Sequence, residues 1–374
     1  MTIKLLHTAD WQIGKGFATF EGDPGALLRT QRIKTVEHIA KTANERQVDV
    51  ILVAGDLFEI NSVSDETLRR TLNAMRAFIG PWILLPGNHD PALSDSIWTR
   101  LPRLGLTDNV RLATTQDPIL LLNDQLAVLP APLQRRHEAN DVTEWFDTAF
   151  TPVGAFRVGL AHGSVANRLP QQSEAPNVIS DTRSETAKLD YLALGDWHGT
   201  LEIAPRTWYS GTPEPDRFRN NEHGNVLIVT LTEPGKSPTV EPVSVAHYGW
   251  KQLDHVVSGQ EDVSALDTVL GAESNAERLV VRLALRGTVD LATRRHIEEI
   301  LGRHQARFHA LRIEDDELFA SPSDQDLDSI DTMGFVRSAI DELQAKARNP
   351  GDADSQTAQR ALQKLYVEHM RMND

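Results

Sequence analysis

The sequence contains no cysteine, and this absence removes two kinds of chemistry at once. Without thiols the chain forms no disulfide bond and binds no metal through sulfur, a composition that fits the reducing cytoplasm. No apolar run approaches the roughly 20 residues that a membrane-spanning helix needs. The first apolar run begins at Ile3, which leaves no room for a signal peptide. We therefore expect a soluble, cytoplasmic protein.

Positive charge is also scarce. The chain of 374 residues has 38 Lys and Arg against 53 Asp and Glu, a formal net charge of −15. Residues 1–245 hold 23 basic and 30 acidic side chains, and residues 246–374 hold 15 and 23. Because nucleic-acid binding normally depends on basic patches, composition argues against it unless bound cations supply positive charge locally. The chain also lacks a phosphate-binding Gly-Lys-Ser/Thr loop, which argues against ATP hydrolysis.

Metal-binding side chains, by contrast, are concentrated in five short segments. These are residues 7–12 (HTADWQ), 55–59 (GDLFE), 87–90 (GNHD), 161–163 (AHG) and 195–198 (GDWH), and each follows an apolar run. Because alternate residues of a strand share a face, Asp10 should point with Gln12, and Asp196 with His198. The donors are Asp10, Gln12, Asp56, Asn88, His162, Asp196 and His198. Seven are too many for one ion and suit two that share a carboxylate, a recurrent arrangement in phosphoester hydrolysis.

In this order the segments resemble the motifs of the calcineurin-like metallophosphoesterases, and within them the SbcD-like branch of DNA repair nucleases. That family carries Asp-x-His, Gly-Asp-x-x-Asp, Gly-Asn-His-Asp, Gly-His and Gly-His-x-His. Residues 209–214 (YSGTPE) resemble the segment that follows the last motif in the nuclease branch. The resemblance implies an α/β fold: a two-sheet β-sandwich flanked by helices, with a small α+β capping domain and C-terminal helices.

Three positions depart from the family pattern. Gln12 stands where the family has His, Asp196 replaces the first His of Gly-His-x-His, and Glu59 replaces the second Asp of Gly-Asp-x-x-Asp. The first two exchanges replace an imidazole nitrogen by oxygen, and oxygen-rich sites favour manganese or magnesium over zinc. We therefore predict dependence on Mn²⁺, with Mg²⁺ as the other candidate. The alternative is that Gln12 marks a loss of activity.

Carried over by position, the resemblance implies two ligand sets that share Asp56. The first ion would contact Asp10, Gln12, Asp56 and His198, and the second Asp56, Asn88, His162 and Asp196. We expect the ion at Gln12 to bind more weakly. The ions would activate a water that attacks the phosphate.

The residues beside the ligands have expected roles as well. His89 would contact the phosphate or the leaving oxygen, as stabiliser or proton donor, and Asp90 would orient its ring. Glu59 is expected to brace the loop. Trp11 and Trp197 flank ligands and could stack bases, although strand alternation points both into the core. Substrate-contact candidates are the loop cations Lys15, Arg135, Arg136, Arg217 and Arg219.

Three domains follow from the pattern along the chain. Residues 1–245 alternate strands with helices at 24–47 and 65–78, which predicts a catalytic α/β domain. Residues 246–320 predict a β-α-β capping domain, with strands at 278–285 and 306–313 and a helix at 290–304. Residues 321–374 predict an acidic linker and a helical arm. Residues 314–331, which overlap the end of the capping domain, hold eight acidic residues and no Lys or Arg, and we expect them to form a solvated linker.

Three functions fit these residues. The first is a manganese-dependent DNA phosphodiesterase of repair that cuts single strands, duplex ends or hairpins. The second is a phosphodiesterase or phosphatase for a small molecule, and the third is a non-catalytic scaffold for DNA or an ATPase. The apolar stripes of the helices at 332–348 and 355–372 fit docking of an SMC-like ATPase, as the resemblance implies, and fit packing within the domain equally well. A homodimer is a further possibility by resemblance.

Overall fold

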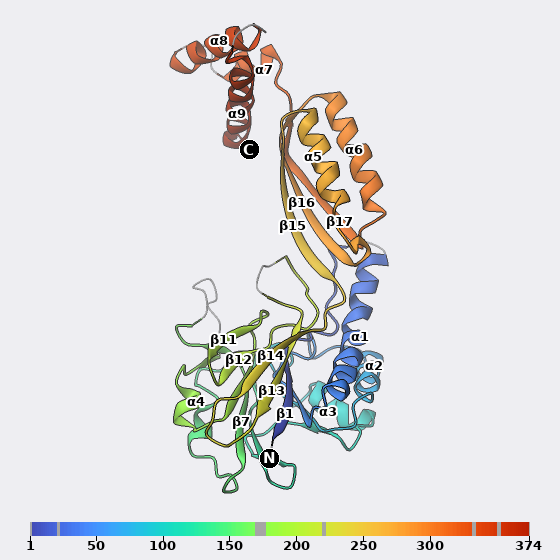
Figure 1. Ribbon diagram of the computed structural model, residues 1–374, viewed down its shortest axis with the longest axis vertical. Coiled ribbons are helices and arrows are strands. Elements are labelled where there is room, and N and C mark those ends of the chain that lie inside the picture. The colour runs from blue at the N-terminus through green and yellow to red at the C-terminus, as the bar shows by residue number, and fades with distance from the viewer. Residues whose placement is uncertain are drawn as a thin grey trace. The chain divides into compact units, whose positions relative to one another are not determined.

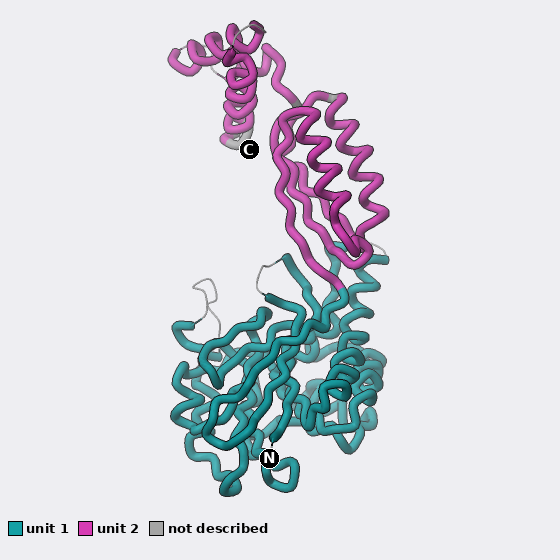
Figure 2. Tube along the Cα trace, in the orientation of Figure 1, with its two compact units in different colours: residues 1–247 teal, residues 248–374 magenta. Residues whose placement is uncertain are grey.

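The computed structural model describes residues 2–20, 23–168, 177–218, 222–330, 334–349 and 353–373. The chain divides into two compact units, Met1–His247 and Tyr248–Asp374 (Figure 2). Each unit is described by itself below.

Two six-stranded sheets form the centre of the first unit. The first has the order β14-β13-β1-β2-β3-β4, and the second has the order β11-β12-β10-β7-β6-β5. Strands β1 to β4 are parallel, as are β12, β10, β7 and β6, while β13, β14, β5 and β11 are antiparallel to their neighbours. A two-stranded sheet joins β8 and β9.

The bounds of these strands locate the candidate metal donors. The first sheet contains β1 (Ile3–Thr8), β2 (Val50–Val53), β3 (Trp82–Leu84), β4 (Val110–Leu112), β13 (Asn225–Leu231) and β14 (Thr239–Ser244). The second contains β5 (Ile119–Leu121), β6 (Leu126–Ala131), β7 (Phe156–His162), β10 (Tyr191–Gly195), β11 (Leu201–Ala204) and β12 (Thr207–Tyr209), and the small sheet contains β8 (Ser164–Val165) and β9 (Val178–Ile179). The donor segments follow β1, β2, β3 and β10 or lie at the end of β7. Carboxyl ends of parallel strands meet at one edge of a sheet, where open α/β folds bind ligands.

Apolar side chains hold the two sheets together and attach the helices. One core cluster joins both sheets, with Leu5 and Leu52 from the first and Val158 and Leu160 from the second. A second cluster packs helices against the outer face of the first sheet (Figure 1). The helical segments are α1 (Asp23–Glu45), α2 (Asp65–Met75), α3 (Ile97–Arg100), η1 (Leu101–Leu104), η2 (Glu144–Asp147) and α4 (Arg183–Thr186). The predicted α/β fold of two sheets flanked by helices is confirmed.

Local sequence explains where α2 begins and which face it buries. The Ser64 side chain caps the helix by accepting a hydrogen bond from the Thr67 amide. Leu68, Leu72 and Met75 then recur at helical spacing, and all three are buried. The helix predicted over residues 65–78 therefore forms, although it ends three residues earlier, at Met75.

The second unit contains a three-stranded parallel sheet with helices on one face (Figure 1). Its elements are β15 (Gly249–Val257), α5 (Gln260–Gly271), η3 (Ala276–Arg278), β16 (Leu279–Val289), α6 (Leu291–Gln305) and β17 (Ala310–Ala320). Asp290 caps α6 by accepting a hydrogen bond from the Thr293 amide. The predicted β-α-β unit is thus a larger β-α-β-α-β unit, because β15 and α5 were not foreseen. Their apolar residues pack in a core shared with β16 and α6.

The acidic segment at residues 314–331 is not a solvated linker, which corrects the expectation from its charge. Strand β17 continues to Ala320, and Asp324–Ile330 forms helix α7. Glu314 lies 3.3 Å from Arg282, and Glu317 lies 3.3 Å from Arg286 of the neighbouring strand. Opposite charges on adjacent strands stabilise a sheet, so these carboxylates support strand structure. Asp331 lies outside the described residues.

Helices α8 (Phe335–Ala347) and α9 (Ser355–Asn373) complete the second unit. Leu327 of α7, Ile340 of α8 and Leu362 of α9 form one buried cluster, with Leu343, Ala347, Leu365 and Tyr366 packed against it. The apolar stripes of the two helices therefore pack within this helical group. Among the described residues, no helix combines the length and the apolar character needed to cross a lipid bilayer.

Candidate metal centre

Four of the seven candidate donors lie on strained backbone beyond the strand ends. The φ angles of Asp10, Gln12, Asp56 and Asp196 are 54°, 44°, 52° and 104°, in the region that non-glycine residues rarely adopt. Strand alternation, which we expected to pair Asp10 with Gln12, is therefore not what aims these side chains. Hydrogen bonds between the loops hold them instead: the Asp10 amide donates to the Gly55 carbonyl (3.1 Å) and the Gln12 amide to the Asp56 carbonyl (2.9 Å). Such strain is characteristic of functional sites.

Three of the seven candidate donors converge in the protein interior. Ligand atoms of Asp10, Asp56 and His162 all lie within 4.8 Å of one another, and all three residues are buried. His162 Nε2 lies 3.5 Å from Asp56 Oδ1 and 3.8 Å from Asp196 Oδ1. Its other nitrogen, Nδ1, lies 2.8 Å from the Ala54 carbonyl oxygen, to which it donates. This bond directs Nε2 toward the carboxylates, and metal-binding histidines are commonly oriented by such a bond from the other ring nitrogen.

The pKa shifts in this group have a common electrostatic cause. Burial raises the pKa of Asp10 well above its usual value, and the neighbouring carboxylates of Asp56 and Asp196 raise it further, against His162, which lowers it. Burial alone would lower the pKa of His162, but the carboxylates of Asp56, Asp10 and Asp196 raise it to about 9. Buried carboxylates so close together favour a positive charge between them. The group therefore attracts either a proton or a metal cation.

Asn88 and Asp196 extend the group on one side. Asn88 Nδ2 lies 3.5 Å from Asp196 Oδ1, and the Ser164 hydroxyl donates to Asp196 Oδ2 at 2.8 Å. The Asp196 amide lies 3.2 Å from Asp10 Oδ1. Asn88 Oδ1 and His162 Nε2 are both buried and have no hydrogen-bond partner among the described residues. Buried polar atoms without a partner are rare in native proteins. A divalent cation would satisfy Asn88 Oδ1 and would replace the proton that the raised pKa of His162 indicates on Nε2, so this donor set fits one.

Two glycines permit the close approach of these loops. A Cβ atom at Gly87 would lie 2.2 Å from Asp56 Oδ1, and one at Gly195 would lie 1.9 Å from the Ala54 carbonyl oxygen and 2.7 Å from His162 Nδ1. Real Cβ atoms do not approach other atoms so closely. Only glycine therefore fits at either position without displacing a candidate ligand.

Gln12 and His198 lie on the other side of the group, together with charged residues. Gln12 Nε2 lies 3.2 Å from His198 Nε2, and Lys15 Nζ lies 3.3 Å from Gln12 Oε1. Lys15 Nζ also lies 2.5 Å from Asp216 Oδ2. Asp216 Oδ1 in turn is 3.0 Å from Arg217 Nε and 3.6 Å from His198 Nδ1. Lys15 and Arg217, proposed as substrate contacts, thus both lie beside the metal donors.

Asp216 and Arg32 were not identified by sequence reasoning. Burial raises the pKa of Asp216, but hydrogen bonding to His198 and the charge of Arg32 outweigh it, and the pKa lies well below its usual value. Arg32 is buried and donates to the carbonyl oxygens of Gln12 (3.3 Å) and Glu214 (2.7 Å). The available signal was the position of Asp216 just after the 209–214 segment. Nothing local to Arg32 in helix α1 indicates this contact.

His89 and Asp90 have different partners from those expected. His89 Nδ1 lies 3.0 Å from the Glu59 carbonyl oxygen, which orients the ring in place of Asp90. The Asp90 carboxylate accepts hydrogen bonds from the amides of Gly87 (2.7 Å) and Phe58 (3.0 Å). Asp90 is buried, and burial raises its pKa well above the usual value. The expectation that Asp90 orients His89 is therefore corrected: Asp90 holds the loop that carries Asn88.

The remaining candidates lie apart from this network or outside the described residues. Arg135 and Arg136 are exposed, and Arg219 belongs to the part of the chain that is not described. Trp11 is buried in the core, as expected. Trp197 is only partly buried: it packs against a core cluster and, with Trp208, also lines a cleft of about 550 Å³, so its expected place in the core is met only in part.

Comparison with known proteins places these features in a family. The family described as calcineurin-like phosphoesterase matches residues 3–230. The DNA double-strand break repair protein Mre11 of Methanosarcina acetivorans is 25% identical over 241 residues, 62% of this chain and 37% of the relative. Its namesake from Methanosarcina mazei is 25% identical over 244 residues, with coverage of 62% and 37%. A component of the nuclease SbcCD of Bacillus subtilis is 24% identical over 276 residues, 64% of this chain and 69% of the relative. The chain therefore spans only 37% of the length of the two Mre11 relatives.

Proposed function

Because the chain belongs to the calcineurin-like phosphoesterase family, we propose that its metal centre holds two divalent ions and hydrolyses DNA phosphodiester bonds. The observation that carries this proposal is a pair of buried polar atoms, Asn88 Oδ1 and His162 Nε2, that have no hydrogen-bond partner among the described residues. Both side chains lie near Asp196, and His162 also forms, with Asp10 and Asp56, a group whose ligand atoms all lie within 4.8 Å of one another. Desolvated carboxylates and unpaired polar atoms in one place support binding of a cation.

The proposed ligands follow from these contacts and from the family pattern. Asp10, Gln12, Asp56 and His198 would hold one ion, and Asp56, Asn88, His162 and Asp196 would hold the other. Two ions held there would supply the positive charge that lowers the pKa of an attacking water and neutralises charge on the phosphate. Most of the donors are oxygen atoms, which supports Mn²⁺, or Mg²⁺, over zinc.

Residues around the donors position the ligands and the substrate. His89 uses Nδ1 for the Glu59 carbonyl, so a proton passed to the leaving oxygen would come from Nε2. Asp216 lies next to His198 Nδ1 and holds the imidazole with its Nε2 toward Gln12. Lys15 and Arg217 supply positive charge for the phosphate backbone beside the ions, in a protein whose net charge is −15.

DNA as the substrate is supported by the relatives, two named as DNA double-strand break repair proteins and one as part of a nuclease. We propose cleavage of single strands, duplex ends or hairpins during repair. Residues 1–245 would form the catalytic domain, 246–320 a capping domain and 321–374 an arm. An ATPase partner is proposed from the relative named as one component of SbcCD. It would dock on α8 and α9, where Phe335 is 87% exposed.

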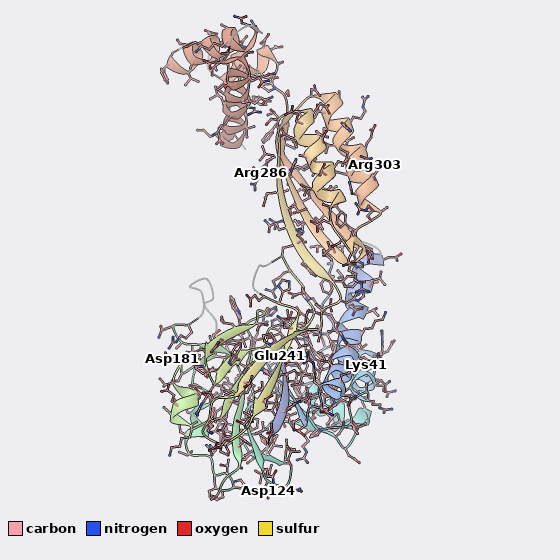
Figure 3. The ribbon with its side chains drawn as sticks, in the orientation of Figure 1. Lys41, Asp124, Asp181, Glu241, Arg286 and Arg303 are labelled. Carbon is pink, nitrogen blue, oxygen red and sulfur yellow. The ribbon has the colours of Figure 1, made fainter. Side chains whose placement is uncertain are left out.

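The test is incubation of the metal-free protein with labelled single-stranded, duplex and hairpin DNA across a series of Mn²⁺, Mg²⁺ and Zn²⁺. The Asp56→Asn variant should lose cleavage, because it removes a shared ligand. Asp124→Asn is the matched control, on an exposed loop between β5 and β6 (Figure 3). DNA cleavage with Mn²⁺ that is lost only in Asp56→Asn supports the proposal. Turnover of a small phosphodiester without cleavage of DNA would refute the DNA assignment and leave a phosphodiesterase.

A further inference from the structure

Lys15 is held beside the metal centre by a buried carboxylate. Its ammonium lies 2.5 Å from Asp216 Oδ2, and the Asp216 side chain is only 1% exposed. Asp216 also pairs with Arg217 and lies close to His198, so its place is fixed from several directions. The second contact of Lys15 is Gln12 Oε1, at 3.3 Å. A lysine ammonium in this position makes a charge-assisted hydrogen bond to the amide oxygen.

This contact determines which way the Gln12 amide points. A lysine ammonium only donates, so the Gln12 atom facing it is the oxygen, and the amide nitrogen faces His198. That nitrogen lies 3.2 Å from His198 Nε2. An amide NH₂ group also only donates, and so does the Arg217 guanidinium, whose Nη2 lies 3.2 Å from Nδ1 of the same ring. The amide nitrogen therefore stands in front of Nε2, the ring nitrogen that would bind a metal, and the amide oxygen is turned toward Lys15.

We propose that Lys15, through the Gln12 amide, controls loading of the ion position formed by Asp10, Gln12, Asp56 and His198. Rotating the Gln12 amide brings its oxygen to that position and uncovers His198 Nε2, but it breaks the bond to Lys15. Loading of this position therefore costs one charge-assisted hydrogen bond. At the position with Asn88, His162 and Asp196, by contrast, Asn88 Oδ1 and His162 Nε2 have no hydrogen-bond partner among the described residues, although Ser164 donates to Asp196 Oδ2. The two ions bind in order, the Asn88 position first.

The consequence depends on the histidine-to-glutamine departure at residue 12. An imidazole at that position has no amide oxygen to offer Lys15. Control by Lys15 is then a property of this chain and requires Gln12. The inference rests on the proposed function only for the existence of two ion positions, and it concerns their relative affinity rather than the reaction.

The test is a double-mutant cycle read by metal binding, not by activity. Metal-free wild type, Lys15→Met, Gln12→His and the double variant are titrated with MnCl₂ by isothermal calorimetry, and free Mn²⁺ is counted by electron paramagnetic resonance. Lys34→Met is the matched control, since Lys34 is exposed on α1. Lys15→Ala is a second variant that removes the same ammonium. In every variant, the affinity for the more tightly bound ion shows whether the metal centre is folded.

We expect two ions in wild type, with Lys15→Met tightening only the weaker one by about tenfold, the size of one charge-assisted hydrogen bond. Gln12→His should tighten the same ion, and adding Lys15→Met to it should change little. If Lys15→Met tightened the weaker ion equally in wild type and in Gln12→His, the cause would be charge repulsion between Lys15 and the metal ion, and the inference would be overturned. No effect of Lys15→Met on this affinity would overturn it as well. Absence of any bound ion would refute the proposed function as well, which separates the two failures.

Discussion

His7 links the two sheets next to the metal centre and should make the stability of the first unit depend on pH. It is the next-to-last residue of β1 and has no exposed surface. Its Nδ1 lies 2.9 Å from the Tyr191 hydroxyl and its Nε2 lies 3.1 Å from the Leu194 carbonyl oxygen, both on β10 of the other sheet. Burial lowers the pKa of His7 from 6.5 to about 3, although the bond to Leu194 acts in the opposite direction. The ring is therefore neutral at pH 7.

The magnitude follows from this pKa. Below pH 6.5 the unfolded chain takes up a proton at His7 and the folded chain does not, so acid favours unfolding. The stability that His7 contributes is complete above pH 6.5 and is lost progressively as the pH falls toward 3. A pH of 5 lies about 1.5 units below the pKa of histidine in the unfolded chain, so protonation of the unfolded state lowers the free energy of unfolding by about 2 kcal/mol.

The assay is urea unfolding of wild type and His7→Gln at pH 7.5 and pH 5, followed by tryptophan fluorescence, which reports mainly on the first unit. Buried Asp10 and Asp90 have raised pKa values and respond to acid in the opposite sense, so the difference between the two proteins isolates His7. Glutamine keeps a donor and an acceptor for the two partners. The stability advantage of wild type should shrink by about 2 kcal/mol at pH 5, or about 0.8 M in the urea midpoint. An advantage that stays constant would refute a neutral, buried His7.

Four further predictions concern the metal centre directly. Gly87→Ala should reduce kcat by at least about 100-fold, because its Cβ would lie 2.2 Å from Asp56 Oδ1; wild-type rates would contradict this. Asp90→Ala should lower the free energy of unfolding by about 2–4 kcal/mol, measured in urea, because it leaves two buried amides unpaired. His89→Ala should instead lower kcat by about 100-fold or more with little change in stability, and the reverse pattern would exchange the two roles. Chelation of metal should lower the melting temperature by about 5–10 °C relative to protein at 100 times the dissociation constant, and an unchanged melting temperature would argue against tight binding.

Local sequence indicated the strands of the first unit that lead into the donor segments and the kinds of side chain at their ends. An apolar run followed by Gly-Asp or Gly-Asn-His is a local pattern, so its elements could be predicted with errors of a few residues at their ends. The reason given for the aim of Asp10 and Gln12 was wrong, however. Both residues have positive φ, and contacts with the loop after β2 hold them there. The periodicity of residues along one segment does not record contacts with a distant loop.

The composition of residues 314–331 led to a wrong prediction, because the ion-pair partners of their acidic side chains cannot be read from the sequence. Glu314 and Glu317 pair with arginines of the strand beside them, which a count of charges along the chain does not reveal. Strand β15 was missed because charged and polar residues interrupt its apolar residues on an open sheet face. Its register with β16 identifies it as a strand.

The amino-acid sequence by itself determined the family, the α/β class and the chemical types of the candidate ligands, because these depend on short patterns of neighbouring residues. Tertiary structure alone decided which residues control those ligands. Lys15 and Asp216 are 201 residues apart in the chain and 2.5 Å apart in space. Asp90 binds two amides of its own and a neighbouring loop rather than the adjacent histidine. The energy of such contacts depends on burial and on how the loops pack, and a linear pattern of residues records neither.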